Sequence, residues 1–94
     1  MTGYTVRIEL HAATYDDYET LHTAMQSAGF SRTIKSDNGT IYQLPTAEYS
    51  VSSDGDVNAV LKAASNAAAR TGKNYGALVT AAGPRAWIGL TQLR

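Results

Sequence analysis

The sequence predicts a small α+β domain whose elements follow in the order strand, helix, strand, strand, helix, strand. Two observations predict this class. Segments in which apolar and polar residues alternate, typical of half-buried strands, are interleaved with two segments whose apolar residues recur at helical spacing. The length of 94 residues supports one compact core but not two. We therefore expect residues 1–94 to form a single domain.

The first strand is expected at Tyr4 to Leu10, where apolar residues occupy every second position. A helix should follow, because Thr14 and Asp17 resemble a capping pair and apolar side chains then recur three or four residues apart. Gly29 is a suitable C-cap. The segment therefore predicts an amphipathic helix that packs one face against the sheet.

A hairpin is expected next. Residues Phe30 to Lys35 alternate in polarity, Asp37 to Gly39 suit a tight turn, and Thr40 to Tyr42 form the returning arm. Pro45 cannot donate a hydrogen bond to a ladder, so we expect the chain to kink there. Beyond the kink, Glu48 to Ser52 should form the better-packed part of the strand.

Ser53 and Asp54 are expected to cap a second helix whose apolar stripe consists mainly of small side chains and ends near Gly72. The last strand should run from Tyr75 to Val79. Residues 83–94 then form a C-terminal extension, which should dock on the core or on a second copy because three of its side chains are too apolar to face solvent: Trp87, Ile88 and Leu90.

This order of elements matches the ferredoxin-like βαββαβ arrangement, a four-stranded antiparallel sheet with two helices on one face. The apolar fraction of 44% and the charged fraction of 17% are ordinary for a globular protein. No stretch approaches the roughly 20 apolar residues that cross a bilayer, and the N-terminus lacks the pattern of a signal peptide. We therefore expect a soluble, cytoplasmic protein without a membrane partner.

Charge and cysteine content exclude several classes of function. Eight basic residues balance eight acidic ones, so the strongly basic character of a protein that coats nucleic acid is missing. The chain has no cysteine, which excludes disulfides and thiolate metal sites. We expect no cofactor, although carboxylates could still hold a divalent metal ion.

Three stretches, Tyr4 to Leu10, Met25 to Phe30 and Tyr42 to Tyr49, resemble the GhoS family of small bacterial proteins, and the resemblance extends over nearly the whole chain. It implies a ferredoxin-like fold related to the small CRISPR adaptation nucleases. It also implies the role of an antitoxin in a type V toxin–antitoxin system, acting as an endoribonuclease on single-stranded RNA. In such a reaction a base activates a 2′-hydroxyl or water, and cations stabilise the transition state.

Glu9 stands where the CRISPR relatives carry a metal-binding aspartate, which argues against a metal-dependent reaction here. A histidine can serve as general acid or base near neutral pH, and arginine or lysine can bind phosphate. The candidate catalytic residues are His22, His11, Glu9 and Arg32, and the candidate RNA-binding residues are Arg7 and Lys35.

Each candidate also has a purely structural interpretation. His22 lies at the edge of the apolar stripe of the first helix, and His11 lies at the solvated end of the first strand. Arg7, Glu9 and Lys35 should face away from the helices, where cross-strand ion pairs worth roughly 0.2–1 kcal/mol would account for them. The six tyrosines are expected to pack in the core or in an interface.

The main alternative to a nuclease is a non-catalytic ferredoxin-like module that binds a protein partner or a small ligand through the open sheet face or the segment around Trp87. For either function we expect a homodimer, because this fold commonly covers its open face with a second copy. The residues expected at that interface are Trp87, Ile88 and Leu90.

Overall fold

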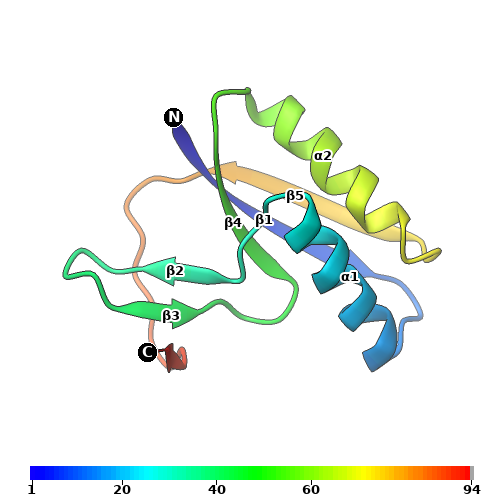
Figure 1. The fold of residues 1–94 in the computed structure, drawn as a ribbon, viewed down its shortest axis with the longest axis horizontal. Coiled ribbons are helices and arrows are strands. Elements are labelled where there is room, and N and C mark those ends of the chain that lie inside the picture. Colours follow the sequence, from blue (N-terminus) through cyan, green and yellow to red (C-terminus); the bar gives the residue numbers. More distant parts are fainter. Residues whose placement is uncertain (94) are drawn as a thin grey trace.

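The computed structural model describes residues 1–93, which form two helices and two three-stranded antiparallel sheets (Figure 1). The α+β class is therefore confirmed. In chain order the elements are β1 (Thr2–Leu10), α1 (Tyr15–Ser27), β2 (Thr33–Lys35), β3 (Ile41–Gln43), β4 (Glu48–Ser53), α2 (Val57–Ala69), β5 (Tyr75–Ala81) and β6 (Gln92–Leu93).

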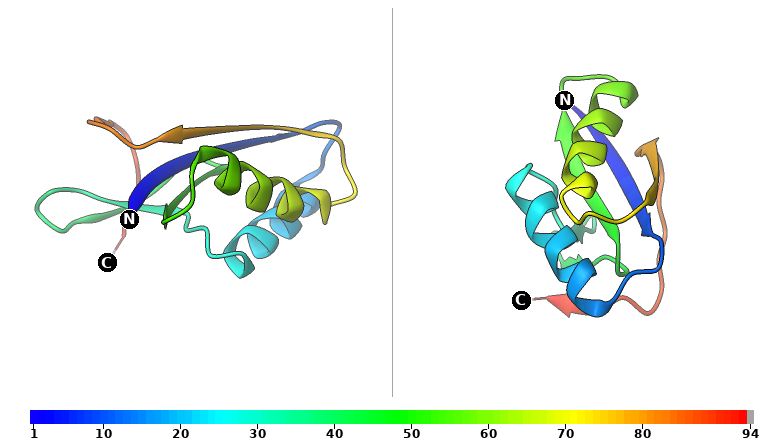
Figure 2. Two further views of the ribbon diagram at one scale, coloured as in Figure 1. Left: turned by 90° about the horizontal axis from the view of Figure 1, so that it is seen from above. Right: turned by 90° about the vertical axis from the view of Figure 1, so that its right-hand side faces the viewer.

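The first sheet has the order β4-β1-β5, with β1 antiparallel to both neighbours. Both helices lie on one face of this sheet and leave the other face open (Figure 2). The alternation of β1 matches this arrangement, since Val6 and Ile8 are buried toward the helices while Arg7 and Glu9 are exposed on the open face. The first strand was thus predicted with the correct face inward.

The predicted start of α1 is confirmed. The backbone N–H of Asp17 donates to the hydroxyl of Thr14 at 3.3 Å, and the Asp17 carboxylate accepts from the backbone N–H of Thr14 at 2.8 Å. The predicted cap of α2 is wrong: the cap is Asp56, whose carboxylate accepts from the N–H of Ala59 at 2.9 Å. Ser53 instead accepts from the N–H of Gly55 and holds the preceding turn.

The prediction of a single four-stranded sheet is wrong. Strand β2 pairs with β3, and β6 completes a second sheet of order β2-β3-β6. The only backbone ladder between the two sheets among residues 1–93 is one bridge, in which Ser31 and Ser50 exchange hydrogen bonds of 2.8 and 2.7 Å. After this bridge, the backbone N–H of Thr33 donates to the side-chain hydroxyl of Ser31 at 3.1 Å and not to β4. The pairing of this segment with β4 therefore ends at the bridge.

The predicted interruption at Pro45 is confirmed, because β3 ends at Gln43 and β4 begins at Glu48. Ala47, between the two strands, has a φ of +70°, a left-handed conformation that turns the chain sharply. The two arms can therefore belong to different sheets.

The core lies between the inner face of the first sheet and the two helices. Its largest fully buried side chains come from both layers: Tyr49, Ile8, Leu21, Met25 and Val6. Helix α2 contributes mostly small buried side chains, Val60, Ala64, Ala67 and Ala68. Small side chains let this helix lie close to β5 and β1.

The C-terminal extension docks on the same chain. The ring of Trp87 contacts that of Tyr42 edge to face, with centroids 5.5 Å apart. The guanidinium of Arg85 donates to the hydroxyl of Thr5 at 2.9 Å, on the open face of the first sheet. Leu90 is half-buried, whereas Ile88 is 95% exposed. Neither helix of the described chain is long and apolar enough to cross a membrane.

Candidate functional site

His22 and Tyr49 form a polar contact at the edge of the core. The side-chain oxygen of Tyr49, a fully buried residue of β4, lies 2.5 Å from Nδ1 of His22 on α1. The two rings are tilted by 56° with centroids 5.8 Å apart. His22 itself is half-buried, so the contact joins the interior to the surface.

Burial fixes the protonation of this pair. Desolvation raises the pKa of Tyr49 to about 12, so its hydroxyl keeps its proton and can either donate to Nδ1 of His22 or accept from it. Desolvation and the charge of Arg32 lower the pKa of His22 from its usual 6.5, against the opposing charge of Glu19. At neutral pH His22 is therefore mainly uncharged, and its single ring proton can lie on either nitrogen.

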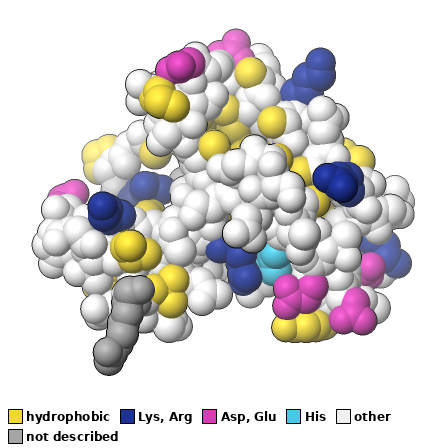
Figure 3. Space-filling model, viewed as in Figure 1, with side chains coloured by type: hydrophobic (Ala, Val, Ile, Leu, Met, Phe, Trp, Pro, Cys, Tyr) yellow, Lys and Arg dark blue, Asp and Glu magenta, His cyan; other side chains and the backbone are white. Residues whose placement is uncertain are grey.

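Two charged residues complete the group. Arg32 follows the Ser31–Ser50 bridge, and its buried Nε makes no hydrogen bond within residues 1–93. Glu19 lies three residues before His22 on the same face of α1. Figure 3 shows one histidine on the visible face, flanked by a basic and an acidic side chain. We call Glu19, His22, Arg32 and Tyr49 the His22 cluster.

Tyr15 extends the acidic side of the His22 cluster by one helical turn. A hydrogen bond to Glu19 and the charge of its carboxylate raise the pKa of Tyr15, although this residue is 77% exposed. Glu19 is thus a hydrogen-bond acceptor on the surface of α1, with Tyr15 as its neighbour. It lies close enough to His22 for its charge to raise the pKa of that histidine, against the larger lowering effects.

Glu9 and His11 form a separate pair at the end of β1. Nε2 of His11 lies 3.5 Å from Oε1 of Glu9, and both side chains are more than half exposed. Glu9 faces the open side of the first sheet, whereas His22 packs against its inner side. The four predicted catalytic residues therefore do not form one site, since the structure groups His22 with Arg32 and His11 with Glu9.

The predicted RNA-binding residues also lie apart. Arg7 is exposed on the open face, opposite Glu48 on one neighbouring strand and Leu78 on the other. Lys35 is exposed at the end of β2. Within residues 1–93, no hydrogen bond or ion pair joins either residue to the His22 cluster. The cation of that cluster that could bind a phosphate is therefore Arg32.

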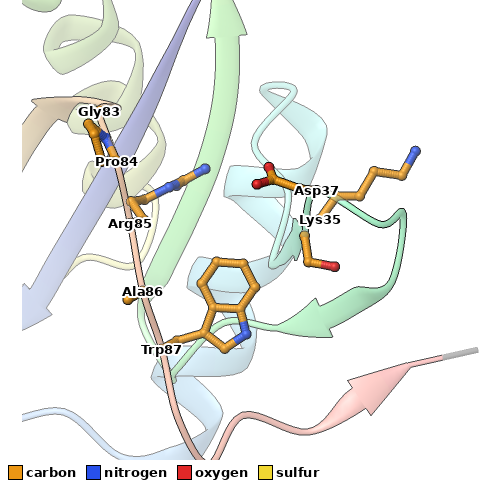
Figure 4. A pocket seen from close by; sticks show the side chains of 8 residues that line it. Lys35, Asp37, Gly83, Pro84, Arg85, Ala86 and Trp87 are labelled. Carbon is orange, nitrogen blue, oxygen red and sulfur yellow. The ribbon is translucent and has the colours of Figure 1, made fainter.

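A groove of about 530 Å³ separates the β2–β3 turn from the C-terminal extension, and we call it the tail groove. Its walls are Lys35, Ser36 and Asp37 on one side and Gly83 to Trp87 on the other. Figure 4 shows the guanidinium of Arg85 and the carboxylate of Asp37 pointing toward one another across it, with the indole of Trp87 below and Lys35 directed outward. The groove thus combines an aromatic ring with groups of both charges.

Within residues 1–93, no three histidine, aspartate or glutamate side chains lie close enough together to share a metal ion, and we assign no metal centre. No family model matches the chain, and no curated protein matches it significantly. The function must therefore be inferred from the chemistry of the side chains.

The sequence interpretation missed two members of the His22 cluster. The spacing of Glu19 and His22, three residues apart on a predicted helix, was a usable signal that both share a face. No local pattern in the sequence pairs Tyr49 with His22, because the two residues are 27 positions apart in the chain and lie on different elements. The tail groove was missed as well, since it joins a turn to the extension.

Proposed function

We propose that this chain is a GhoS-like protein that cleaves single-stranded RNA, with the His22 cluster as its reacting centre. The observation that carries the proposal is the half-buried His22, which lies 2.5 Å from the Tyr49 hydroxyl and close enough to Arg32 and Glu19 for both charges to act on it. Transesterification of RNA needs a base, an acid and a cation at the phosphate, and Glu19, His22 and Arg32 can supply them.

In the proposed reaction the Glu19 carboxylate takes the proton of a 2′-hydroxyl, whose oxygen attacks the adjacent phosphorus. The bond from phosphorus to the 5′-oxygen breaks, and the imidazolium of His22 gives the Nε2 proton to that oxygen. Arg32 stabilises the charge on the pentacovalent phosphorus. The products are a 2′,3′-cyclic phosphate and a free 5′-hydroxyl, so no water or redox partner is consumed.

Tyr49 acts as a positioning residue in this scheme. In this scheme the tyrosine hydroxyl donates to Nδ1 of the neutral His22, and the two atoms lie 2.5 Å apart. When His22 is protonated, Nδ1 becomes the donor and the same hydroxyl can accept. The bond therefore holds the ring in one orientation in both protonation states, with Nε2 left for the substrate.

Three features of the fold support the family proposal. Strand β1 lies between β4 and β5, antiparallel to both. Both helices cover one face of that sheet (Figure 2). The Ser31–Ser50 bridge stands where a ferredoxin-like core would have its fourth strand. We propose a ferredoxin-like core with this strand reduced to one bridge, and an antitoxin role directed at a messenger RNA in the cytoplasm.

The tail groove favours a second candidate function, a non-catalytic module that binds a small ligand. Its volume of about 530 Å³ falls within the usual range for small-molecule sites of roughly 300–1,000 Å³. The indole of Trp87 and the guanidinium of Arg85 suit a ligand with an aromatic and an anionic part. Binding there without any RNA cleavage would favour this function.

The test uses the full-length protein and a labelled pool of single-stranded RNAs, with and without divalent ions, followed by analysis of the product ends. Glu19→Gln and Arg32→Ala should each lower the cleavage rate by about 100-fold or more. Lys62→Ala, a charge change on the exposed face of α2, is the matched control and should cleave normally. Circular dichroism must show that every variant is folded. Wild-type protein that leaves all RNAs intact would overturn the nuclease proposal.

A further inference from the structure

Strand β5 is an unprotected edge. It forms one side of the first sheet, and within residues 1–93 it pairs only with β1. Its seven residues, Tyr-Gly-Ala-Leu-Val-Thr-Ala, include no charged residue and no proline. Natural edge strands usually carry lysine, proline or a bulge that prevents another strand from pairing with them. The absence of charge and proline from this strand leaves its free edge available for pairing with another strand.

The register identifies the backbone groups on that edge. At one end of the β1–β5 ladder the N–H of His11 donates to the carbonyl of Asn74, and at the other the N–H of Ala82 donates to that of Gly3, both at 2.8 Å. Hydrogen-bonded pairs alternate in an antiparallel ladder, so the even-numbered residues of β5 bond to β1. The odd-numbered residues point their N–H and C=O groups outward: Tyr75, Ala77, Val79 and Ala81.

The other side of β1 supports this assignment. The N–H of Ile8 donates to the carbonyl of Ala47 at 3.0 Å, in continuation of the β1–β4 register. Even-numbered residues of β1 therefore bond toward β4, which leaves the odd-numbered ones for β5. The free edge of β5 thus presents four donors and four acceptors.

This edge is self-complementary. If two copies of β5 run antiparallel about a two-fold axis at Leu78, Tyr75 opposes Ala81 and Ala77 opposes Val79 of the other copy. Every outward group then has a partner, whereas a register displaced by two residues leaves at least one of the four outward residues of each strand unpaired. Only this register uses the whole edge.

The side chains fit the same register. Leu78 would meet its own copy in a non-hydrogen-bonded pair, where side chains approach most closely. It is 64% exposed on the open face, so pairing with its own copy would remove apolar surface from water. Its neighbours on that face, Gly76 and Thr80, would oppose each other and are small and uncharged. No like charges would meet across the axis.

We propose that the chain forms a two-fold symmetric homodimer in which β5 pairs with β5 of a second copy, giving one continuous six-stranded sheet with Leu78 on the axis. The partner is a second copy because the outward groups are complementary to themselves. This interface is separate from the interface expected at Trp87, Ile88 and Leu90, and it does not depend on the RNA-cleaving function.

The test measures the mass of the full-length protein in solution by sedimentation at micromolar concentration. Wild-type protein should be a dimer. Leu78→Lys and Leu78→Glu should each weaken dimerisation by about tenfold or more, because like charges would face each other on the axis. Ile88→Lys, at the most exposed side chain of the extension, should leave the dimer intact.

A mixing experiment excludes misfolding as the explanation. Under the proposal Leu78→Lys and Leu78→Glu each dimerise more weakly than wild type, and an equal mixture of them should associate more tightly than either alone because opposite charges now meet on the axis. A monomeric wild-type protein would overturn the proposal. So would a folded Leu78→Lys variant that dimerises as tightly as wild type, a mixture that associates no more tightly than either variant alone, or a dimer that Ile88→Lys abolishes.

Discussion

The side-chain oxygen of Tyr49 lies 2.5 Å from Nδ1 of His22, so a fully buried strand residue holds the ring of a half-buried helix residue. The hydroxyl of Tyr49 keeps its proton and can donate to Nδ1 or accept from it, so the contact is compatible with both neutral tautomers of His22. In the proposed reaction the neutral ring accepts from Tyr49 at Nδ1 and can donate only a hydrogen bond at Nε2, whereas the imidazolium form can give up the Nε2 proton. The proposed scheme therefore uses Glu19 as the base and the imidazolium of His22 as the acid.

Tyr49→Phe removes the hydroxyl and leaves Nδ1 of His22 without its donor. We expect the free energy of unfolding to fall by about 1 kcal/mol, the typical net value of one hydrogen bond. Denaturant unfolding followed by circular dichroism measures this change. Tyr15→Phe, at an exposed tyrosine, is the control and should change stability by less. Equal stability of Tyr49→Phe and wild type would mean that the contact contributes nothing.

The lowered pKa of His22 gives stability a defined pH dependence. The unfolded chain binds a proton near pH 6.5, whereas the folded chain binds it only at lower pH. The stabilisation is therefore complete above pH 6.5 and is lost as the pH falls from 6.5 toward the folded pKa. Denaturant midpoints of wild type and His22→Gln should converge over this interval as the pH falls. A constant difference between them would contradict the lowered pKa.

Thr14→Ala removes the side chain that accepts the N–H of Asp17 at the start of α1. We expect a loss of about 1 kcal/mol in the free energy of unfolding, as for other caps of this type. Thr20→Ala, within the exposed face of the same helix, is the matched control. If both variants unfold at the same denaturant concentration as wild type, the cap is not a source of stability.

Trp87 is the only tryptophan, so its fluorescence reports directly on the tail groove. If the groove takes a ligand with an aromatic and an anionic part, a nucleoside monophosphate should change the emission in a saturable way, because the ring would stack on the indole. Arg85→Ala should weaken that binding by about tenfold, through loss of a charge-assisted hydrogen bond. Emission that does not respond at millimolar ligand would remove the second candidate function.

Local patterns predicted much of the fold. The alternation in Tyr4 to Leu10, the capping pair of α1 and the turn at Asp37 to Gly39 each depend on neighbouring residues, and each appears as expected. The choice of sheet for β2 could not be predicted in this way. The three residues of β2 would show the same alternation whether they paired with β3 or with β4. The hydroxyl of Ser31 favours β3, because it accepts the backbone N–H of Thr33 and so ends the pairing with β4.

The site was predicted less well than the fold because it is assembled from distant segments. His22 and Arg32 were singled out by residue type, but nothing in their local sequence pairs His22 with Tyr49 or separates it from His11. The extension was expected to dock through its apolar residues, and Trp87 does so on Tyr42. That Ile88 stays exposed could not be read from hydrophobicity alone.

The most direct test of the proposed nuclease is single-turnover cleavage of a labelled single-stranded RNA at several values between about pH 5 and 8, comparing wild type with His22→Gln and His11→Gln. The His22 cluster predicts cyclic-phosphate ends, a wild-type rate that falls as the pH rises above the lowered pKa of His22, and a loss of about 100-fold or more in His22→Gln. Absence of wild-type cleavage at every pH, or a loss confined to His11→Gln, would contradict it.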